Sequence, residues 1–268
     1  MLEQGADLHT KNNEALRWTA CHGHLEIVKC LLEQGANLHA ENDCALRYAA
    51  ANGHLEVVKY LLEHGADLHA ENDDALREAA RNGQLEIVKY LVEQGANLHA
   101  DNDFALVLAA QKGYLEVVKY LLEQGASVND RALQLAALQG RLEVVKYLIE
   151  QGDNLHSKND RALQLAAEKG YLEIVNFLVE QGADSNLITE QMLIKLFTSY
   201  DLKIKKITPR LTSLLLKIDL VKKSYRIPRR NEILSTYKKK VLSSLSILMY
   251  HLYYRPSGPG FFQAIGQI

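Results

Sequence analysis

A segment of 30 residues recurs along the chain, and this recurrence constrains the fold more than any other feature of the sequence. The stretch GHLEIVKCLLEQGANLHA begins at Gly23 and returns, with few changes, at Gly53, Gly83, Gly113, Gly140 and Gly170. Every step is 30 residues except one of 27. Such a period is typical of solenoids, in which each unit buries its apolar face only against its neighbours. The sequence therefore predicts a stack of similar units.

Each unit is predicted to contain two helices. In the second unit, Ala45, Ala49 and Ala50 favour a first helix and allow close approach of its neighbours. The apolar residues that follow have helical spacing, and Gly65 is suited to end this second helix in the left-handed conformation. We expect Asp43 to be the N-cap of the first helix, with its carboxylate accepting a backbone N–H. The same role is expected for Asn13, Asp73, Asp103, Asp130 and Asp160.

Glycine, proline and charge all divide the chain near residue 187. Thirteen of the 16 glycines follow the repeat, whereas all four prolines lie beyond residue 187. Residues 1–187 contain 16 Lys or Arg and 29 Asp or Glu, and residues 188–268 contain 15 and 4. A charge split of this size indicates two parts with different surfaces. We expect a repeat domain over 1–187, with a partial unit 1–5 and then units 6–35, 36–65, 66–95, 96–125, 126–152 and 153–182.

The basic remainder is predicted to be a helical C-terminal extension. We expect residues 188–223 to form a helical cap on the last repeat, and residues 224–268 to form a basic and apolar helical tail with a Pro/Gly-rich end. Its longest apolar stretch, 241–254, has 14 residues, which is short of the roughly 18 needed to span a bilayer. The apolar residues expected to cover the last repeat are Leu193, Phe197, Leu211, Leu214 and Leu215.

The recurring motif A-A-x-x-G-H-L-E-V-V-K-Y-L-L-E-x-G-A-D resembles the second half of the ankyrin repeat over residues 1–187. The resemblance implies an all-α, ankyrin-type α-solenoid of about six stacked helix pairs. Two departures stand out, since the Thr-Pro-Leu-His opening of the first helix is absent and the period is 30 instead of 33. We therefore expect short loops or fingers between units. The 30-residue form, with H-A-E-N-D-x-A-L-R, is similar to ankyrin proteins of mimivirus-like giant viruses.

The resemblance also implies where a partner would bind. In ankyrin proteins the end of the first helix lines a concave groove, and the matching positions here differ from unit to unit while the framework repeats. A selected binding surface and neutral drift at exposed sites explain this variation equally well. The expected partner-binding residues are Cys21, His22, Asn52, Arg81, Asn82, Phe104, Gln111, Lys112, Leu138, Gln139, Glu168 and Lys169.

One position of the first helix holds a large apolar residue in five units, namely Trp18, Tyr48, Leu108, Leu135 and Leu165. This pattern favours packing in the core. In the third unit the position holds Glu78, which we expect to pair with an arginine such as Arg47 or Arg77.

The sequence predicts neither a metal site nor a catalytic site. Equivalent residues of stacked helical units lie about 8–10 Å apart, whereas zinc needs each ligand nitrogen at about 2.0–2.1 Å. The recurring histidines His9, His39, His69, His99 and His156 are therefore interpreted as turn residues that satisfy backbone groups. The three cysteines, Cys21, Cys30 and Cys44, have no Cys-x-x-Cys spacing and are interpreted as packing thiols. No phosphate-binding loop, HExxH or GxSxG motif occurs.

These observations predict a non-enzymatic, monomeric scaffold without a cofactor that binds a protein partner, either host or viral if the viral resemblance holds. We expect an intracellular, cytoplasmic protein (in the host cell if viral), since no signal peptide or membrane span is visible and cysteines are few. The alternative is a bipartite adaptor whose basic tail contacts nucleic acid, an anionic membrane surface or a ubiquitin-ligase component. A drifted paralogue with no role beyond folding is a third hypothesis.

Overall fold

The structure of the protein, a computed structural model, describes residues 14–152, 155–156, 160–189, 191–192 and 196. Contacts divide the chain into units 1–199 and 200–268, and all of the described residues belong to the first. The predictions for Asn13, His9 and the apolar positions 193, 197, 211, 214 and 215 fall outside the described residues.

The described residues form twelve α-helices and one short 3-10 turn, with no strand. None of these helices is both long and apolar enough to cross a membrane. The helices are α1 (Glu14–Cys21), α2 (Leu25–Glu33), α3 (Cys44–Asn52), α4 (Leu55–Glu63), α5 (Ala70–Arg81), α6 (Leu85–Glu93), α7 (Phe104–Lys112), α8 (Leu115–Glu123), α9 (Asp130–Leu138), α10 (Leu142–Glu150), α11 (Arg161–Lys169) and α12 (Leu172–Glu180), and the 3-10 turn is η3 (Ser185–Leu187).

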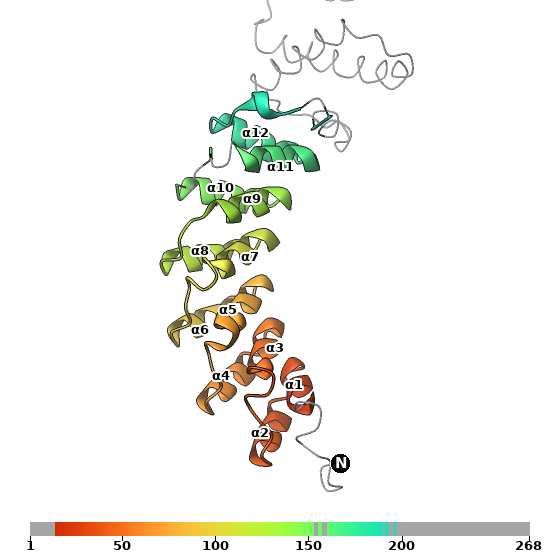
Figure 1. Cartoon of the computed structure of the whole chain (residues 1–268), viewed down its shortest axis with the longest axis vertical. Coiled ribbons are helices and arrows are strands. Elements are labelled where there is room, and N and C mark those ends of the chain that lie inside the picture. Colours follow the sequence, from red (N-terminus) through yellow and green to blue (C-terminus); the bar gives the residue numbers. More distant parts are fainter. Residues whose placement is uncertain (1–13, 153–154, 157–159, 190, 193–195, 197–268) are drawn as a thin grey trace, which may run out of the picture. The chain divides into compact units, whose positions relative to one another are not determined.

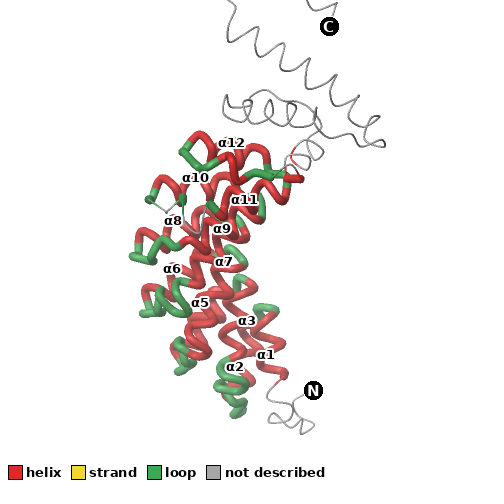
Figure 2. The backbone as a smooth tube through the Cα atoms, turned by 45° about the horizontal axis from the view of Figure 1, so that its top comes forward, coloured by secondary structure: helices red, strands yellow, loops and turns green. Residues whose placement is uncertain are grey.

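The helices pair in chain order and stack in two layers. The odd-numbered helices, from α1 to α11, are the first helices of the units, and the even-numbered ones are the second helices. Each first helix packs on the first helices of the neighbouring units and on the second helix of its own unit (Figure 1). Short turns join the units along the stack (Figure 2). This arrangement is the all-α solenoid of six stacked helix pairs that the sequence predicted, and the fold class is confirmed.

Small and branched apolar residues build the core between units. Ala49 and Ala50 of α3 are fully buried, which lets the backbones of neighbouring first helices approach closely, as the alanine pattern predicted. Leu46 contributes bulk on the same helix, and Val58 and Leu61 do so from α4. No unit encloses these side chains alone, so neighbouring units stabilise one another.

Glycines occupy the turns where only they fit without strain. After α4, Gly65 has φ +95, its N–H donates to Leu62 O and the N–H of Ala66 donates to Leu61 O. This double pattern is a Schellman motif and confirms Gly65 as the helix stop. At Gly83, which has φ +76, a Cβ would lie 2.6 Å from the ring of Tyr114 in the next unit. Gly83 therefore also permits close packing between units.

A left-handed turn replaces the finger between most units. Glu41, Asn42 and Asp43 all have positive φ, between 50 and 56 degrees, and the same conformation recurs at Glu71 to Asp73 and at Asp101 to Asp103. Each non-glycine residue in this region costs about 1–2 kcal/mol, and Asn and Asp tolerate it best. Tertiary contacts must therefore hold this turn.

The recurring aspartate supplies such a contact. Asp43, Asp103 and Asp160 lie at the N-cap position as predicted, but their carboxylates make no capping hydrogen bond, so that part of the prediction is wrong. The carboxylate of Asp73, in a side chain that is almost fully buried, lies 3.0 Å from Nδ1 of His69 and accepts the backbone N–H of Asn97 at 2.9 Å. The other aspartates make the same two contacts, one to a histidine ring and one to a backbone N–H of the next unit. These are Asp43 with His39 and Asp67 N, Asp103 with His99 and Ser127 N, and Asp160 with His156 and Asp184 N.

The 27-residue unit lacks this turn and is capped conventionally. Here Asn129, in the extended conformation, accepts the N–H of Ala132 and is the N-cap of α9. Asp130, predicted as the cap, instead lies in the first turn of the helix. Because the 27-residue unit lacks the histidine, it has no His–Asp pair.

Beyond residue 187, two of the described side chains are buried. Ile188 is 5% exposed and Leu196 is fully buried. Leu172 of α12 is also buried, whereas its counterparts Leu55 and Leu85 in inner units are half-buried. The burial of these side chains agrees with a cover over the last helix pair. A cap that extends to residue 223 stays a prediction.

Candidate protein-binding surface

The first helices present one exposed face along the whole stack, and its most exposed large side chains are aromatic. Trp18 of α1 is 56% exposed and Tyr48 of α3 is 42% exposed. The prediction that they pack in the core is therefore wrong. The core is formed by the leucine two residues earlier, such as Leu16 and Leu46. The position held by Trp18 and Tyr48 instead lies at the surface of the first helices, where no further layer of described residues covers it.

The same position continues as a partly exposed apolar row in the later units. Leu108, Leu135 and Leu165 are half-buried. Trp18 stacks on His22 with ring centroids 4.1 Å apart. Much of its indole ring nevertheless remains exposed at the surface. Large, partly exposed aromatic and aliphatic side chains in a row are typical of protein-binding surfaces.

The residues predicted to bind a partner all lie at the protein surface. Seven are exposed, namely His22, Asn52, Arg81, Asn82, Lys112, Gln139 and Lys169. Five are half-buried, namely Cys21, Phe104, Gln111, Leu138 and Glu168. They lie at the ends of the first helices, except Phe104, which begins α7. Their role in binding stays a prediction.

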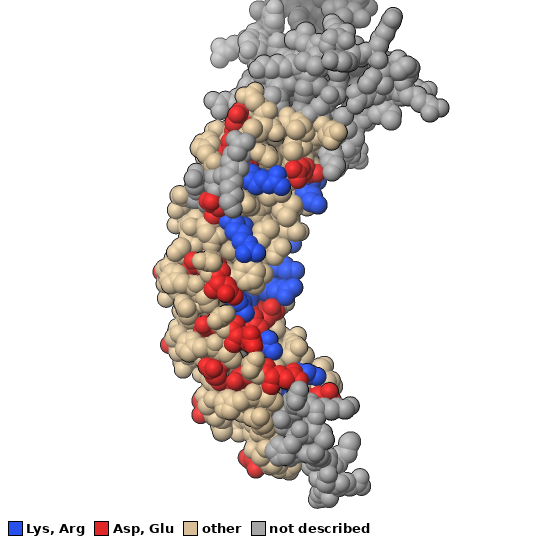
Figure 3. Space-filling model, in the orientation of Figure 1, with Lys and Arg blue, Asp and Glu red and all other residues tan. Residues whose placement is uncertain are grey.

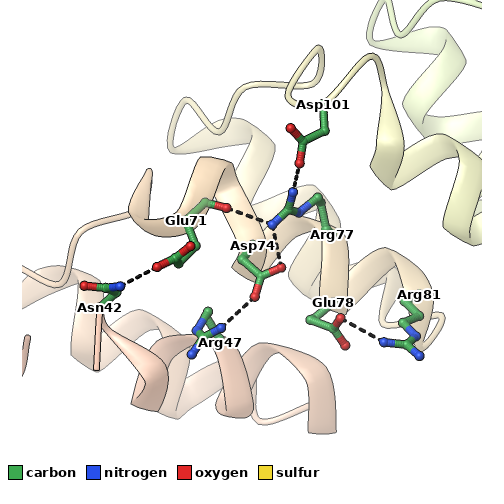
Figure 4. A network of polar contacts seen from close by, with 8 residues as sticks. All are labelled: Asn42, Arg47, Glu71, Asp74, Arg77, Glu78, Arg81 and Asp101. Carbon is green, nitrogen blue, oxygen red and sulfur yellow. Dashed lines mark hydrogen bonds and ion pairs between the residues drawn. The ribbon is translucent and has the colours of Figure 1, made fainter. Parts of the chain in front are cut away.

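In the first three units, arginines of this face are paired with carboxylates of the next turn. Arg17 contacts Glu41 at 2.9 Å and Arg47 contacts Asp74 at 2.9 Å. Arg77 bonds both Asp74, at 2.8 Å, and Asp101 (Figure 4). The pairs of Arg17 with Glu41, Arg47 with Asp74 and Arg77 with Asp101 each join two neighbouring units, whereas Arg77 and Asp74 belong to the same helix.

Burial and pairing act in opposite directions on Arg47. Burial lowers the pKa of its guanidinium, but the hydrogen bond and charge of Asp74 outweigh this effect and the pKa is raised above its usual value. Glu78 does not pair with Arg47 or Arg77 as predicted, because both contact Asp74. It lies 3.2 Å from Arg81 on its own helix (Figure 4).

The last three units have a different charge arrangement. The position held by Arg17, Arg47 and Arg77 is occupied by Val107, Gln134 and Gln164. Cations lie at the helix ends instead, with Arg131 at the start of α9, Arg161 at the start of α11, and Lys112 and Lys169 at the ends of α7 and α11. Figure 3 shows acidic side chains most densely over the N-terminal units of the visible face, whereas basic side chains are distributed along its length.

The described residues offer no metal centre. They contain no group of three or more His, Cys, Asp or Glu side chains that could hold an ion. The recurring histidines bond an aspartate instead of the backbone groups expected for them, and since a carboxylate only accepts, Nδ1 carries the proton. Cys44 is buried, and this burial raises the pKa of its thiol, as expected of an unreactive cysteine.

Comparison with known proteins agrees with this architecture. A family model described as ankyrin repeats (3 copies) matches residues 1–72, 67–132 and 128–189. The structure is similar to the ankyrin repeat domain of human ASB11, with 26% sequence identity and a TM-score of 0.56, over 63% of this chain and 84% of that one. No curated protein matches the chain. Helix pairs stacked through a shared core define the class of helical repeat proteins, and within that class the chain belongs to the ankyrin-repeat family.

The His–Asp hydrogen bonds were not predicted from the sequence, although the sequence contains a signal for them. His39 and Asp43, like His69 and Asp73, recur together four residues apart, and the 27-residue unit lacks the histidine and the tie. A His-Asp spacing of four residues that recurs in four units indicates a shared contact.

Proposed function

We propose that the protein is a non-enzymatic scaffold that binds a partner protein through the exposed face of its first helices. Ankyrin repeats are generally protein–protein interaction modules. The observation that supports this proposal is a row of partly exposed Trp, Tyr and Leu side chains at one position of five of the six first helices. The framework beneath this row already buries its own core. Aromatic side chains in such a place supply large contact area at low cost in conformational entropy.

The partner contacts proposed for this face are those at the helix ends, from Cys21 and His22 in α1 to Glu168 and Lys169 in α11. The first helices are closely packed on one another, so little ordering cost falls on the scaffold when a partner binds. If the likeness to giant-virus ankyrin proteins holds, the partner is a host or viral protein in the cytoplasm of the infected cell, and the scaffold acts as a monomer.

Affinity capture with the full chain tests this proposal. Partners captured from a cell extract and identified by mass spectrometry should be lost when Trp18→Ala and Tyr48→Ala are combined. A control variant combines Lys59→Ala and Lys119→Ala, on the layer of second helices. Loss of the same partners in the control, or their retention in the double aromatic variant, contradicts binding through the first-helix face.

The alternative, a bipartite adaptor, depends on the tail, which lies outside the described residues. It predicts that deletion of residues 226–268 abolishes salt-sensitive binding to DNA or to anionic vesicles. Binding unchanged by the deletion contradicts it.

A further inference from the structure

The surface formed by α7, α9 and α11 combines two properties that the N-terminal units do not share. The first is the leucine track, which we define as Leu108, Leu135, Leu138 and Leu165. All four side chains are half-buried and lie on the exposed face of the first helices. In α1, α3 and α5 the matching positions of the row hold Trp18, Tyr48 and Glu78 instead.

The second property is an excess of positive charge on both sides of the leucine track. Helices α7, α9 and α11 contain four Lys or Arg and two Asp or Glu, whereas α1, α3 and α5 contain four and five. Arg131 is the second residue of α9, after Asp130, while Lys112 and Lys169 end their helices. The two ends of a nine-residue helix are separated by about 12 Å. Cations therefore flank the leucine track on both sides, in an array whose residues 1–187 contain 13 more Asp and Glu than Lys and Arg.

Unlike the arginines of the N-terminal units, these cations do not form ion pairs between neighbouring units in the described part of the array. No ion pair of Lys112, Arg131 or Lys169 is recorded among the described residues, and Arg131 lies over the ring of Phe104 at 4.8 Å. Arg161 contacts Glu168 at 3.4 Å, a long pair between half-exposed side chains. By contrast, Arg17, Arg47 and Arg77 each hold a carboxylate of the neighbouring unit.

From this arrangement we propose that the leucine track and its flanking cations bind an extended peptide segment of a partner protein that carries both aliphatic and acidic side chains. The inference rests on the proposed function and specifies its partner. Neighbouring units lie about 8–10 Å apart, a distance covered by roughly three residues of extended chain. A segment crossing the three helices would therefore place an aliphatic side chain about every third residue, with carboxylates between them facing the cations.

Charge and shape exclude two other occupants of this surface. Residues 188–268 of the chain itself contain 15 Lys or Arg and only 4 Asp or Glu, so the tail repels the flanking cations. Single-stranded nucleic acid binds through aromatic platforms on which bases stack, and the centre of this surface is aliphatic, with its Phe104 ring already under Arg131.

A selection from a random 16-residue peptide library displayed on phage, against the immobilised full chain, tests the proposal. The enriched peptides should contain Asp or Glu together with Leu, Ile or Val. A synthetic copy of the leading peptide should bind more weakly, by roughly tenfold or more, to the variant that combines Arg131→Glu and Lys169→Glu. The loss should shrink in high salt, because exposed charges are screened.

Matched variants separate this inference from the proposed function. Lys59→Glu with Lys119→Glu makes the same change in net charge on the second helices and should leave the affinity unchanged. Trp18→Ala, at the other end of the first-helix face, should also leave it unchanged. Peptides rich in Lys and Arg, or peptides that depend on Trp18 and not on Arg131, overturn the inference while keeping the proposed function. Enrichment of no peptide at all counts against both.

Two further measurements address the excluded occupants. A labelled 30-nucleotide single-stranded DNA should not bind in a manner that depends on Arg131 and Lys169. The molar mass of the full chain in solution should be the same for the wild type and this double variant. DNA binding that the double variant abolishes would assign the surface to nucleic acid. Self-association that this variant abolishes would assign it to a second copy of the chain. Either result overturns the inference.

Discussion

Replacing Asp73 tests whether the buried aspartates tie neighbouring units together. The Asp73 carboxylate accepts the backbone N–H of Asn97 at 2.9 Å and contacts His69 at 3.0 Å, and its own backbone is left-handed with φ 60. A hydrogen bond to a charged group contributes about 1.5–3 kcal/mol. Alanine tolerates the left-handed region less well than aspartate, which adds to this loss. Asp73→Ala should therefore lower the free energy of unfolding by at least about 1.5–3 kcal/mol.

Two companion variants separate these contributions. Asp73→Asn retains an oxygen acceptor and a residue that tolerates the left-handed conformation, so its cost should be about 1 kcal/mol. His69→Ala removes only an exposed partner of the carboxylate, and we expect a loss of about 1 kcal/mol or less. Urea unfolding of the full chain, followed by circular dichroism, measures all three.

Amide hydrogen exchange then identifies which contact was lost. In Asp73→Ala the N–H of Asn97, 24 residues away in the next unit, should exchange faster under native conditions. Had Asp73 been an N-cap, the affected amides would lie in the first turn of its own helix. Unchanged exchange at Asn97, or a stability loss equal to that of His69→Ala, refutes the inter-unit tie.

Three further predictions concern stability and reactivity. Leu76→Ala should cost about 2–5 kcal/mol because Leu76 is almost fully buried, whereas His69→Asn should cost far less, and equal losses in urea unfolding would show that the turn is misassigned. Gly83→Ala should be about 1–3 kcal/mol more destabilising than Gly95→Ala, because both residues have positive φ but only at Gly83 would the new Cβ meet a neighbouring ring; comparable melting temperatures contradict this packing. The Cys44 thiol, whose pKa is raised by burial, should be the slowest of the three to react with a disulfide reagent near neutral pH, and rapid labelling in the native state contradicts its burial.

The helices could be predicted from the sequence because their determinants are local. Apolar spacing within each unit, Gly65 after the second helix, and alanines at the contact between first helices act over a few residues, and the structure confirms each. Repetition strengthened these signals, since each unit repeats the same pattern.

The turns and the first-helix face could not be predicted in the same way, because they depend on residues of other units. Asp43 matches the preference for an N-cap, yet its acceptor oxygen is used by the N–H of Asp67, 24 residues later. Trp18 and Tyr48 are large and apolar, which favours burial, but no layer of the array covers their position. Glu78 pairs with Arg81 because Asp74 already contacts both of the arginines proposed as its partners.

Hydroxyl-radical footprinting of the full chain with its captured partner tests the central claim, that the partner binds the face of the first helices. Trp18 and Tyr48 are exposed on this face, whereas Tyr90 and Tyr120 belong to second helices. The account predicts that the partner protects Trp18 and Tyr48 from oxidation and leaves Tyr90 and Tyr120 unchanged. Protection of Tyr90 and Tyr120, with Trp18 and Tyr48 oxidised as in the free protein, would contradict it.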